Sequence, residues 1–120
     1  MIVCKSAAEI EKMRAANQLV ARILEELAAM VAPGVTTADL DAAAESRVRA
    51  GGAEPAFKGY RGYPATLCAS VNEQVVHGIP SAKPLVSGDI VSLDMGVKLN
   101  GYYGDSAVTV PVGAVTAESP

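Results

Sequence analysis

The chain has 120 residues, the size of one ordinary domain, and half of it is hydrophobic. This composition can bury a real core, which excludes an intrinsically disordered tail. The net charge is -3, whereas nucleic-acid-binding proteins usually carry a basic surplus, so we expect no nucleic-acid partner. No apolar run approaches the roughly 20 residues that span a bilayer, and the start turns polar at Lys5 and Ser6, before a signal-peptide core could form. We therefore expect a soluble, cytoplasmic protein without a membrane segment.

The first predicted element is a long amphipathic helix. It begins at the capping box Ser6-Ala7-Ala8-Glu9, in which the Ser6 and Glu9 side chains satisfy free backbone amides of the first turn. Pro33-Gly34 ends it. Between these points, residues recur at spacings of three and four and form one mostly apolar stripe. The stripe consists of Ile10, Met13, Asn17, Val20, Leu24, Leu27 and Val31.

A second helix and several strands follow. The helix begins near Thr36-Thr37, carries an apolar side of Leu40, Ala44 and Val48, and ends at Gly51-Gly52. Residues 53–64 form a loop rich in Gly, Pro and aromatic residues, and strands are predicted at 66–71, 90–97 and 102–110. Asn100-Gly101 joins the last two strands as a hairpin. Two helices followed by a run of strands predict an α+β fold, with both helices on one face of an antiparallel sheet.

The hairpin register places two aspartates on one face of the sheet. With Asn100-Gly101 as a two-residue turn, Asp94 lies opposite Ala107 and Asp105 lies opposite Gly96. The two acids are then diagonal neighbours, roughly 7–8 Å apart at Cα, and point away from the apolar face that packs on the helices. Close carboxylates repel each other unless a cation lies between them, and a pair of divalent ions is one solution. Two solvated acids on an exposed sheet face are the alternative.

Two further groups could carry chemistry. His77, the only histidine, lies among apolar residues, where it is a ligand, an acid–base group or a hydrogen-bonded structural residue. Phe57, Tyr60 and Tyr63 stand on the glycine-rich segment that leads to Cys68. Such a segment either lines a pocket for an apolar side chain or packs its rings on the core. The sequence contains no dinucleotide fingerprint, P-loop, Cys-x-x-Cys or nucleophile-elbow pattern.

Taken together, these residues resemble the type I methionine aminopeptidases over nearly the whole chain. The most specific features are His77-Gly78-Ile79-Pro80 and the eleven-residue step from Asp94 to Asp105. The helical segments are less specific. The other matching segments are residues 5–6, 9–14, 33–37, 57–64, 70–76, 88–94 and 101–105.

The resemblance implies a fold, an activity and roles for individual residues. The fold is half of a pita bread, in which two pseudo-symmetric α+β halves enclose a dinuclear metal site. Asp94 resembles the family's bidentate ligand and Asp105 its bridging ligand for up to two divalent ions, Co, Mn, Fe, Zn or Mg. His77 resembles the catalytic histidine that contacts the substrate, and the implied activity is metal-dependent removal of methionine from the N-terminus of nascent peptides. The residues that match the pocket for the methionine side chain are Tyr60, Tyr63, Cys68, His77 and, where some members carry cysteine, Phe57.

The sequence departs from the family after Asp105. The family's site also needs a histidine and two glutamates from its second half, including the general base, but here His77 is the only histidine and Glu118 the only acid beyond Asp105. We therefore expect residues 1–120 to form a single domain, the N-terminal half of the fold, inactive without a complementary C-terminal half. Two alternatives stay open: a second copy completes a homodimeric metal site, or the chain is a non-catalytic binding module.

Overall fold

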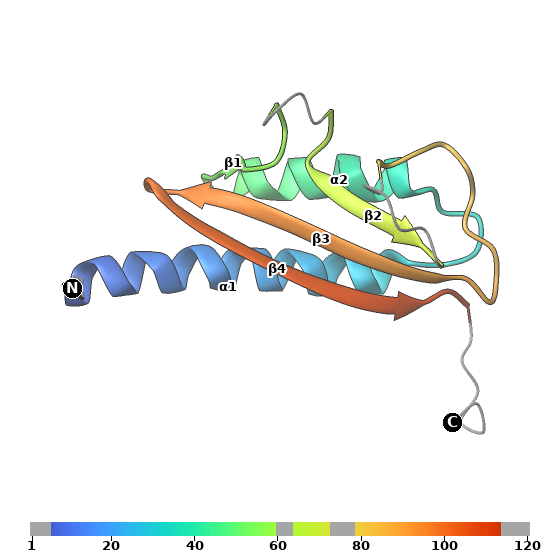
Figure 1. Ribbon diagram of the computed structural model, residues 1–120, viewed down its shortest axis with the longest axis horizontal. Helices are drawn as coiled ribbons and strands as arrows, with labels where there is room; N and C mark the ends of the chain where they lie inside the picture. Colours follow the sequence, from blue (N-terminus) through green and yellow to red (C-terminus); the bar gives the residue numbers. More distant parts are fainter. Residues whose placement is uncertain (1–5, 60–63, 73–78, 114–120) are drawn as a thin grey trace, which may run out of the picture.

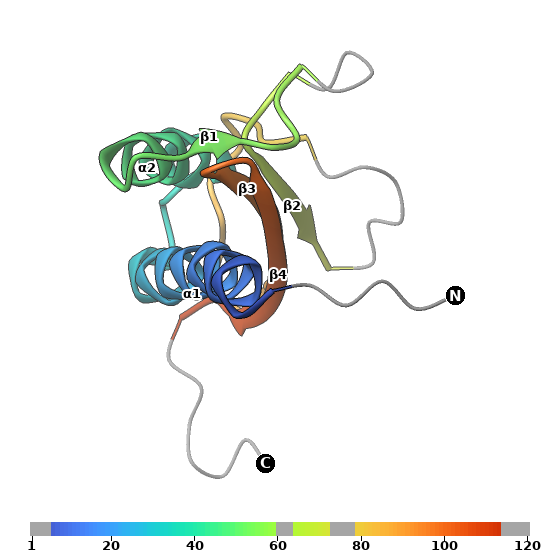
Figure 2. The ribbon, with the colours of Figure 1, turned by 90° about the vertical axis from the view of Figure 1, so that its left-hand side faces the viewer.

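The computed structural model describes residues 6–59, 64–72 and 79–113. Within these ranges, two helices lie on one face of a four-stranded antiparallel sheet (Figure 1). Figure 2 views the layers end-on, with both helices on the same side of the curved sheet. The predicted α+β arrangement is therefore confirmed. The elements are α1 (Ala7–Met30), α2 (Thr37–Ala50), β1 (Glu54–Pro55), β2 (Leu67–Val71), β3 (Ile90–Leu99) and β4 (Tyr102–Pro111).

The sheet is organised around β3. This strand pairs with β4 along its whole length, and with β2 and the short β1 on its other edge. The turn between β3 and β4 is the predicted one, with Leu99 paired to Tyr102. Asn100 and Gly101 both have positive φ, 53° and 84°, the conformation of the hairpin turns that Asn-Gly favours. The two strands are slightly longer than predicted, reaching Leu99 and Pro111.

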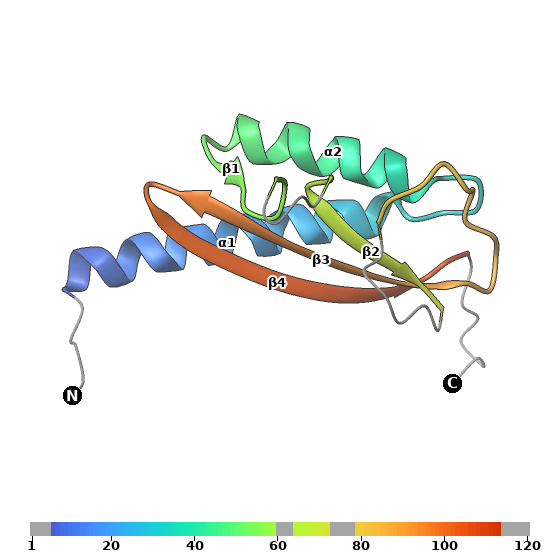
Figure 3. The same cartoon turned by 45° about the horizontal axis from the view of Figure 1, so that its top comes forward.

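The core lies between the sheet and the two helices. Residues of β3 alternate in burial, and Val91, Leu93, Met95 and Val97 are fully buried, as expected for one sheet face packed on helices. Helix α1 packs on β3 and β4, whereas α2 packs beside β1 and β2 (Figure 3). In the part of the chain that the structure describes, no helix is long and apolar enough to cross a membrane.

Helix α1 begins as predicted but buries a partly different face. The Ser6 Oγ accepts from the Glu9 backbone amide at 3.1 Å, and Glu9 Oε1 accepts from the Ser6 amide at 3.0 Å. Ile10, assigned to the apolar stripe, is 46% exposed, and Asn17 is exposed as well. These two residues of the predicted stripe therefore do not pack in the core. The buried face consists of Ala16, Leu19, Val20, Ile23, Leu24 and Leu27.

The buried face of α1 differs from the predicted stripe because β4 approaches the helix closely. A Cβ added to Gly104 would lie 2.6 Å from the Ala16 carbonyl carbon and 2.7 Å from the Asn17 nitrogen. The strand therefore meets the backbone of α1 on the Ala16 side. Successive residues are rotated by about 100° around the helix axis. A pattern of spacings of three and four is therefore compatible with either of two neighbouring helix faces being buried.

Helix α2 matches its prediction, whereas the segment after it, predicted as a loop, contains a short strand. Thr36 and Asp39 form a capping box, and the predicted apolar side of Leu40, Ala44 and Val48 is fully buried. The segment predicted as a loop contains β1, in which Glu54 pairs with Lys98. β1 has only two residues, too few for an alternating pattern to mark it in the sequence.

Candidate functional site

The two aspartates lie on the sheet face opposite the helices, as predicted. Asp94 pairs with Ala107 and Asp105 pairs with Gly96, so the acids are diagonal neighbours on adjacent strands. Both are exposed. Directly opposed residues of an antiparallel pair share a face, and the buried residues of β3 occupy the other face. We call the face that carries Asp94 and Asp105 the outward face.

The electrostatics of this pair favour a cation. Partial burial, and after it the negative charge of Asp105, raises the pKa of Asp94 above its usual value. A raised pKa means that the ionised carboxylate is disfavoured in this environment. A cation bound nearby would stabilise the ionised form. Carboxylate oxygens are donors that Mg²⁺, Mn²⁺ and other divalent ions accept. Across the described ranges, no three His, Cys, Asp or Glu side chains converge on one point, so the pair fits part of a ligand set.

Helix α1 fixes the backbone at one of the two acids. The Asn17 side-chain oxygen accepts a hydrogen bond from the Asp105 backbone amide at 3.3 Å, and its Nδ2 donates to the Met13 carbonyl at 3.1 Å. Asn17 therefore ties the middle of α1 to the strand that carries Asp105. Sequence reasoning missed this role, although a lone amide in an otherwise apolar stripe was its signal.

Cys68 lies beside Asp94. It is the Cα partner of Asp94 across the β2–β3 pair, so it shares the outward face. Its thiol is free and half-buried. Further along the same face, the Ser92 and Thr109 hydroxyls are 3.2 Å apart. The structure thus brings one predicted pocket residue directly against a predicted metal ligand.

Phe57 lies beside the other acid. With Gly96, Tyr103 and Asp105 it lines a small open pocket of about 170 Å³. A Cβ on Gly96 would come within 3.1 Å of the Phe57 ring, so the ring packs on β3 at the position opposite Asp105. The predicted residues that the structure brings to one region are Phe57, Cys68, Asp94 and Asp105, whereas Tyr60, Tyr63 and His77 lie outside the described residues.

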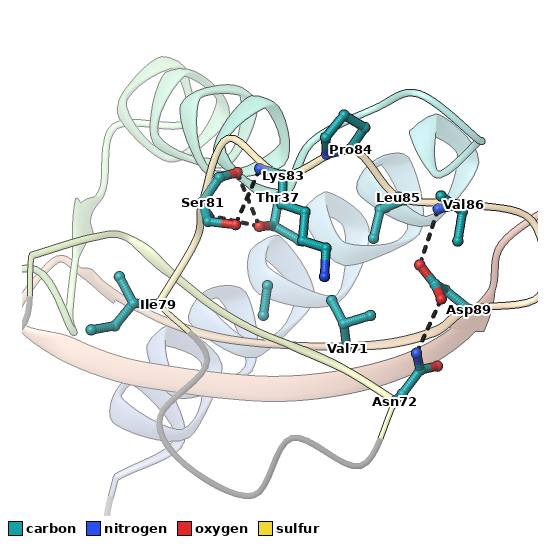
Figure 4. Close-up of a pocket in the computed structure, with 11 residues that line it drawn as sticks. Thr37, Val71, Asn72, Ile79, Ser81, Lys83, Pro84, Leu85, Val86 and Asp89 are labelled. Carbon is teal, nitrogen blue, oxygen red and sulfur yellow. Dashed lines mark hydrogen bonds between the residues drawn. The ribbon is translucent and has the colours of Figure 1, made fainter.

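A larger pocket of about 310 Å³ lies elsewhere, between the start of α2, the end of β2 and the segment before β3 (Figure 4). Among the described residues, its lining includes none of the predicted site residues. At the rim of the pocket, the Thr37 hydroxyl accepts a hydrogen bond from the Ser81 backbone amide at 2.9 Å. The Asp89 carboxylate accepts from the Val86 amide and from the Asn72 side chain, both at 3.0 Å. These bonds hold the walls of the pocket, and the geometry separates it from the aspartate pair.

Comparison with known sequences shows the protein family to which the chain belongs. The model of metallopeptidase family M24 matches residues 11–119. The chain belongs to this family. It is 50% identical to methionine aminopeptidase 1 of Bacillus subtilis over 116 residues, which cover 97% of the chain and 47% of that protein. It is also 50% identical to methionine aminopeptidase 1 of Mycobacterium tuberculosis over 113 residues, 93% of the chain and 42% of that protein.

Solved M24 structures superpose on the whole of this fold. Methionine aminopeptidase from Rickettsia prowazekii matches with a TM-score of 0.91 and 39% identity, over 99% of this chain and 48% of the other. Prolidase from Pyrococcus furiosus matches with a TM-score of 0.78 and 25% identity, over 95% of this chain and 32% of the other. The fold is therefore half of a pita bread, as predicted, and the chain spans about half the length of the curated relatives it matches.

Proposed function

We propose that this M24 chain provides the N-terminal half of a cytoplasmic methionine aminopeptidase, in which Asp94 and Asp105 ligate divalent metal ions. The observation that carries the proposal is the aspartate pair on the outward face. One member has a raised pKa because of burial and of the other's charge. The identity of about half to curated methionine aminopeptidases supports the choice of reaction. The substrate is then a peptide whose first residue is methionine.

Each proposed site residue has its own task. Asp94 and Asp105 hold the metal, and bound divalent ions supply Lewis acidity that activates water and polarises a peptide carbonyl. Phe57 and Cys68 flank the two acids and would form walls of the methionine pocket, to which we also assign Tyr60 and Tyr63. His77 would contact the substrate near the scissile bond.

We expect this chain to need further residues for activity. A dinuclear site takes more ligands than two carboxylates supply, and the described ranges offer no third one at the same point. The sequence holds no second histidine. The missing ligands and the general base would therefore come from a complementary C-terminal half, consistent with the 47% coverage of the Bacillus subtilis relative.

Joining the chain to the C-terminal part of that relative tests the proposal. The hybrid should hydrolyse Met-Ala-Ser when Mn²⁺ or Co²⁺ is present, and the 120-residue chain alone should not. In the hybrid, Asp94→Asn and Asp105→Asn should each lower kcat/KM by at least a hundredfold, because a carboxylate ligand is lost. The matched control is Glu11→Gln, which neutralises an exposed acid of α1 and should leave turnover unchanged.

Three outcomes would contradict the proposal. An active hybrid that tolerates Asp94→Asn would remove the metal role of this residue. Turnover by the isolated chain that rises with the square of its concentration would favour a site shared by two copies. A hybrid that folds and binds methionyl peptides without hydrolysing them under any divalent metal would favour a binding module.

A further inference from the structure

Two acids of α2 hold residues 57–59 and 64–68, the described parts of the segment that carries Phe57 and Cys68. Asp41 and Glu45 lie one turn apart on the helix, and we call them the α2 carboxylate pair. Helix α2 runs beside β1 and the start of β2 (Figure 3), so residues four apart present both carboxylates to this segment. On sequence alone, such a pair of acids is typical of a solvated helix face.

Asp41 anchors the start of β2. Its Oδ1 accepts from the Thr66 backbone amide at 2.9 Å and from the Leu67 amide at 2.8 Å. Leu67 is fully buried and is the first residue of β2. A carboxylate that accepts two backbone amides is a strong, charge-assisted anchor. It therefore fixes the strand immediately before Cys68, which faces Asp94.

Glu45 contacts both Lys58, which follows Phe57, and Thr66, which precedes β2. Its Oε1 lies 2.6 Å from Lys58 Nζ and 3.2 Å from the Thr66 hydroxyl. Thr66 is fully buried, so its hydroxyl needs a partner. Lys58 directly follows Phe57, the ring that packs beside Asp105. Hydrogen bonds from Lys58 and Arg49 lower the pKa of Glu45, which keeps it charged at neutral pH.

We propose that the α2 carboxylate pair positions Phe57 and Cys68 on either side of the metal-binding aspartates and thereby sets the binding of the methionine side chain. The inference rests on the proposed function for its substrate, whereas the anchoring itself belongs to this chain alone. Asp41 and Glu45 are positioning residues, since they act through Leu67, Thr66 and Lys58. The Lys58 side chain is 44% exposed, so its ion pair with Glu45 adds little stability and acts mainly as a constraint on geometry.

The anchoring can be measured on the chain itself. In a Cys4→Ser background, Cys68 is the single thiol, and its alkylation by iodoacetamide reports the position of β2. Asp41→Ala should speed alkylation at least fivefold, while Asp41→Asn, which keeps an acceptor oxygen, should stay within twofold of the parent. Glu45→Ala should likewise speed tryptic cleavage after Lys58 at least fivefold, with Glu45→Gln intermediate.

A stability control separates positioning from general loosening. Ile23→Val shortens a side chain of α1 that is 1% exposed and should leave both rates within twofold. The inference is overturned if Asp41→Ala alkylates like its parent, or if Ile23→Val accelerates both reactions as much as the alanine variants do.

The hybrid enzyme supplies the functional test. Asp41→Ala and Glu45→Ala should raise KM for Met-Ala-Ser about tenfold with kcat within threefold, and Asp41→Asn should restore KM. A fall in kcat at unchanged KM would overturn the positioning role. If the parent hybrid has no activity, the proposed function fails, and the alkylation and cleavage rates still decide whether the α2 carboxylate pair anchors the segment.

Discussion

Asp94 carries a charge that is unfavourable in this chain without a bound cation. Its pKa is raised, first by burial and then by the charge of Asp105, so at pH 7 the ionised form costs folding free energy. Asp94→Asn should therefore increase the free energy of unfolding of the metal-free protein by roughly 0.5 kcal/mol, the scale of an exposed cross-strand charge interaction. Urea denaturation at pH 7 in EDTA measures it. A lower stability for Asp94→Asn would show that the repulsion is negligible or that the carboxylate has a favourable partner.

Gly104 sets how closely β4 approaches α1. The atoms that an added Cβ would meet are backbone atoms of Ala16 and Asn17, at 2.6 to 2.8 Å, and backbone cannot move aside as a side chain can. Gly104→Ala should therefore cost about 2 kcal/mol or more of unfolding free energy, as overpacking does in a dense interior. Chemical denaturation measures the loss.

Gly96 is the matched control for this glycine. It lies on β3, is also buried, and an added Cβ would meet the Phe57 ring at 3.1 Å and the Ala56 Cβ at 3.3 Å. Because these are side-chain atoms that can shift, Gly96→Ala should cost less than Gly104→Ala. Equal losses would mean that the helix contact is no tighter than the ring contact.

At the scale of whole elements, α2 depends on an ionised cap. The Thr36 amide donates to Asp39 Oδ2 at 3.1 Å, and the Thr36 hydroxyl accepts from the Asp39 amide at 3.0 Å. Hydrogen bonds to the carboxylate, first from the Thr36 backbone amide and then from the Thr36 side chain, lower the pKa of Asp39 in the folded state. A lowered carboxylate pKa contributes stability above the unfolded-state value, and this contribution is lost as pH falls through the folded-state value.

The pH dependence of Asp39→Asn follows from this sign. The variant should be less stable than the parent at pH 7, and the difference should shrink as pH falls through the lowered folded-state pKa of Asp39, because the parent carboxyl then becomes neutral like the amide of the variant. Urea denaturation of both proteins at pH 7, 5 and 3 measures the difference. A gap that stays constant across this range would assign the effect to shape rather than charge.

Most of the architecture could be predicted from local signals. The capping boxes, the apolar side of α2 and the Asn100-Gly101 turn depend on residues a few positions apart, and the structure confirms all of them. The packed face of α1 could not be predicted correctly, because it is decided by Gly104, which lies far along the chain and meets the helix at Ala16. A pattern of spacings alone does not contain that contact.

Some residues of the candidate site could likewise be predicted from local signals, whereas others could not. Asp94 and Asp105 could be placed together because a two-residue turn fixes the register of the hairpin, and strand alternation fixes the face. Asn17 and the α2 carboxylate pair could not be found, since each acts across tertiary contacts with residues 13 or more positions away. The anchors of the site are thus less visible in the sequence than its ligands.

At the scale of the molecule, one sheet face packs on two helices and the other holds the charged pair. The outward face carries Asp94 and Asp105, and Ile90 and Tyr103 on the same strands are 50% and 64% exposed. If a complementary half supplies the remaining ligands, metal would bridge the two parts, and binding and assembly would be thermodynamically linked.

This linkage predicts a metal-dependent complex in trans. The chain and the separately produced C-terminal part of the Bacillus subtilis relative should associate in a 1:1 ratio, with Mn²⁺ tightening the complex at least tenfold. Asp105→Asn should abolish the effect of Mn²⁺ and keep the metal-free affinity, because it removes a proposed ligand without changing the shape of the contact surface. Light scattering with and without EDTA measures the stoichiometry, and titration of one part with the other measures the affinity. Glu11→Gln should behave like the parent. Homodimers of the chain that form with Mn²⁺ alone would instead support a site built by two copies.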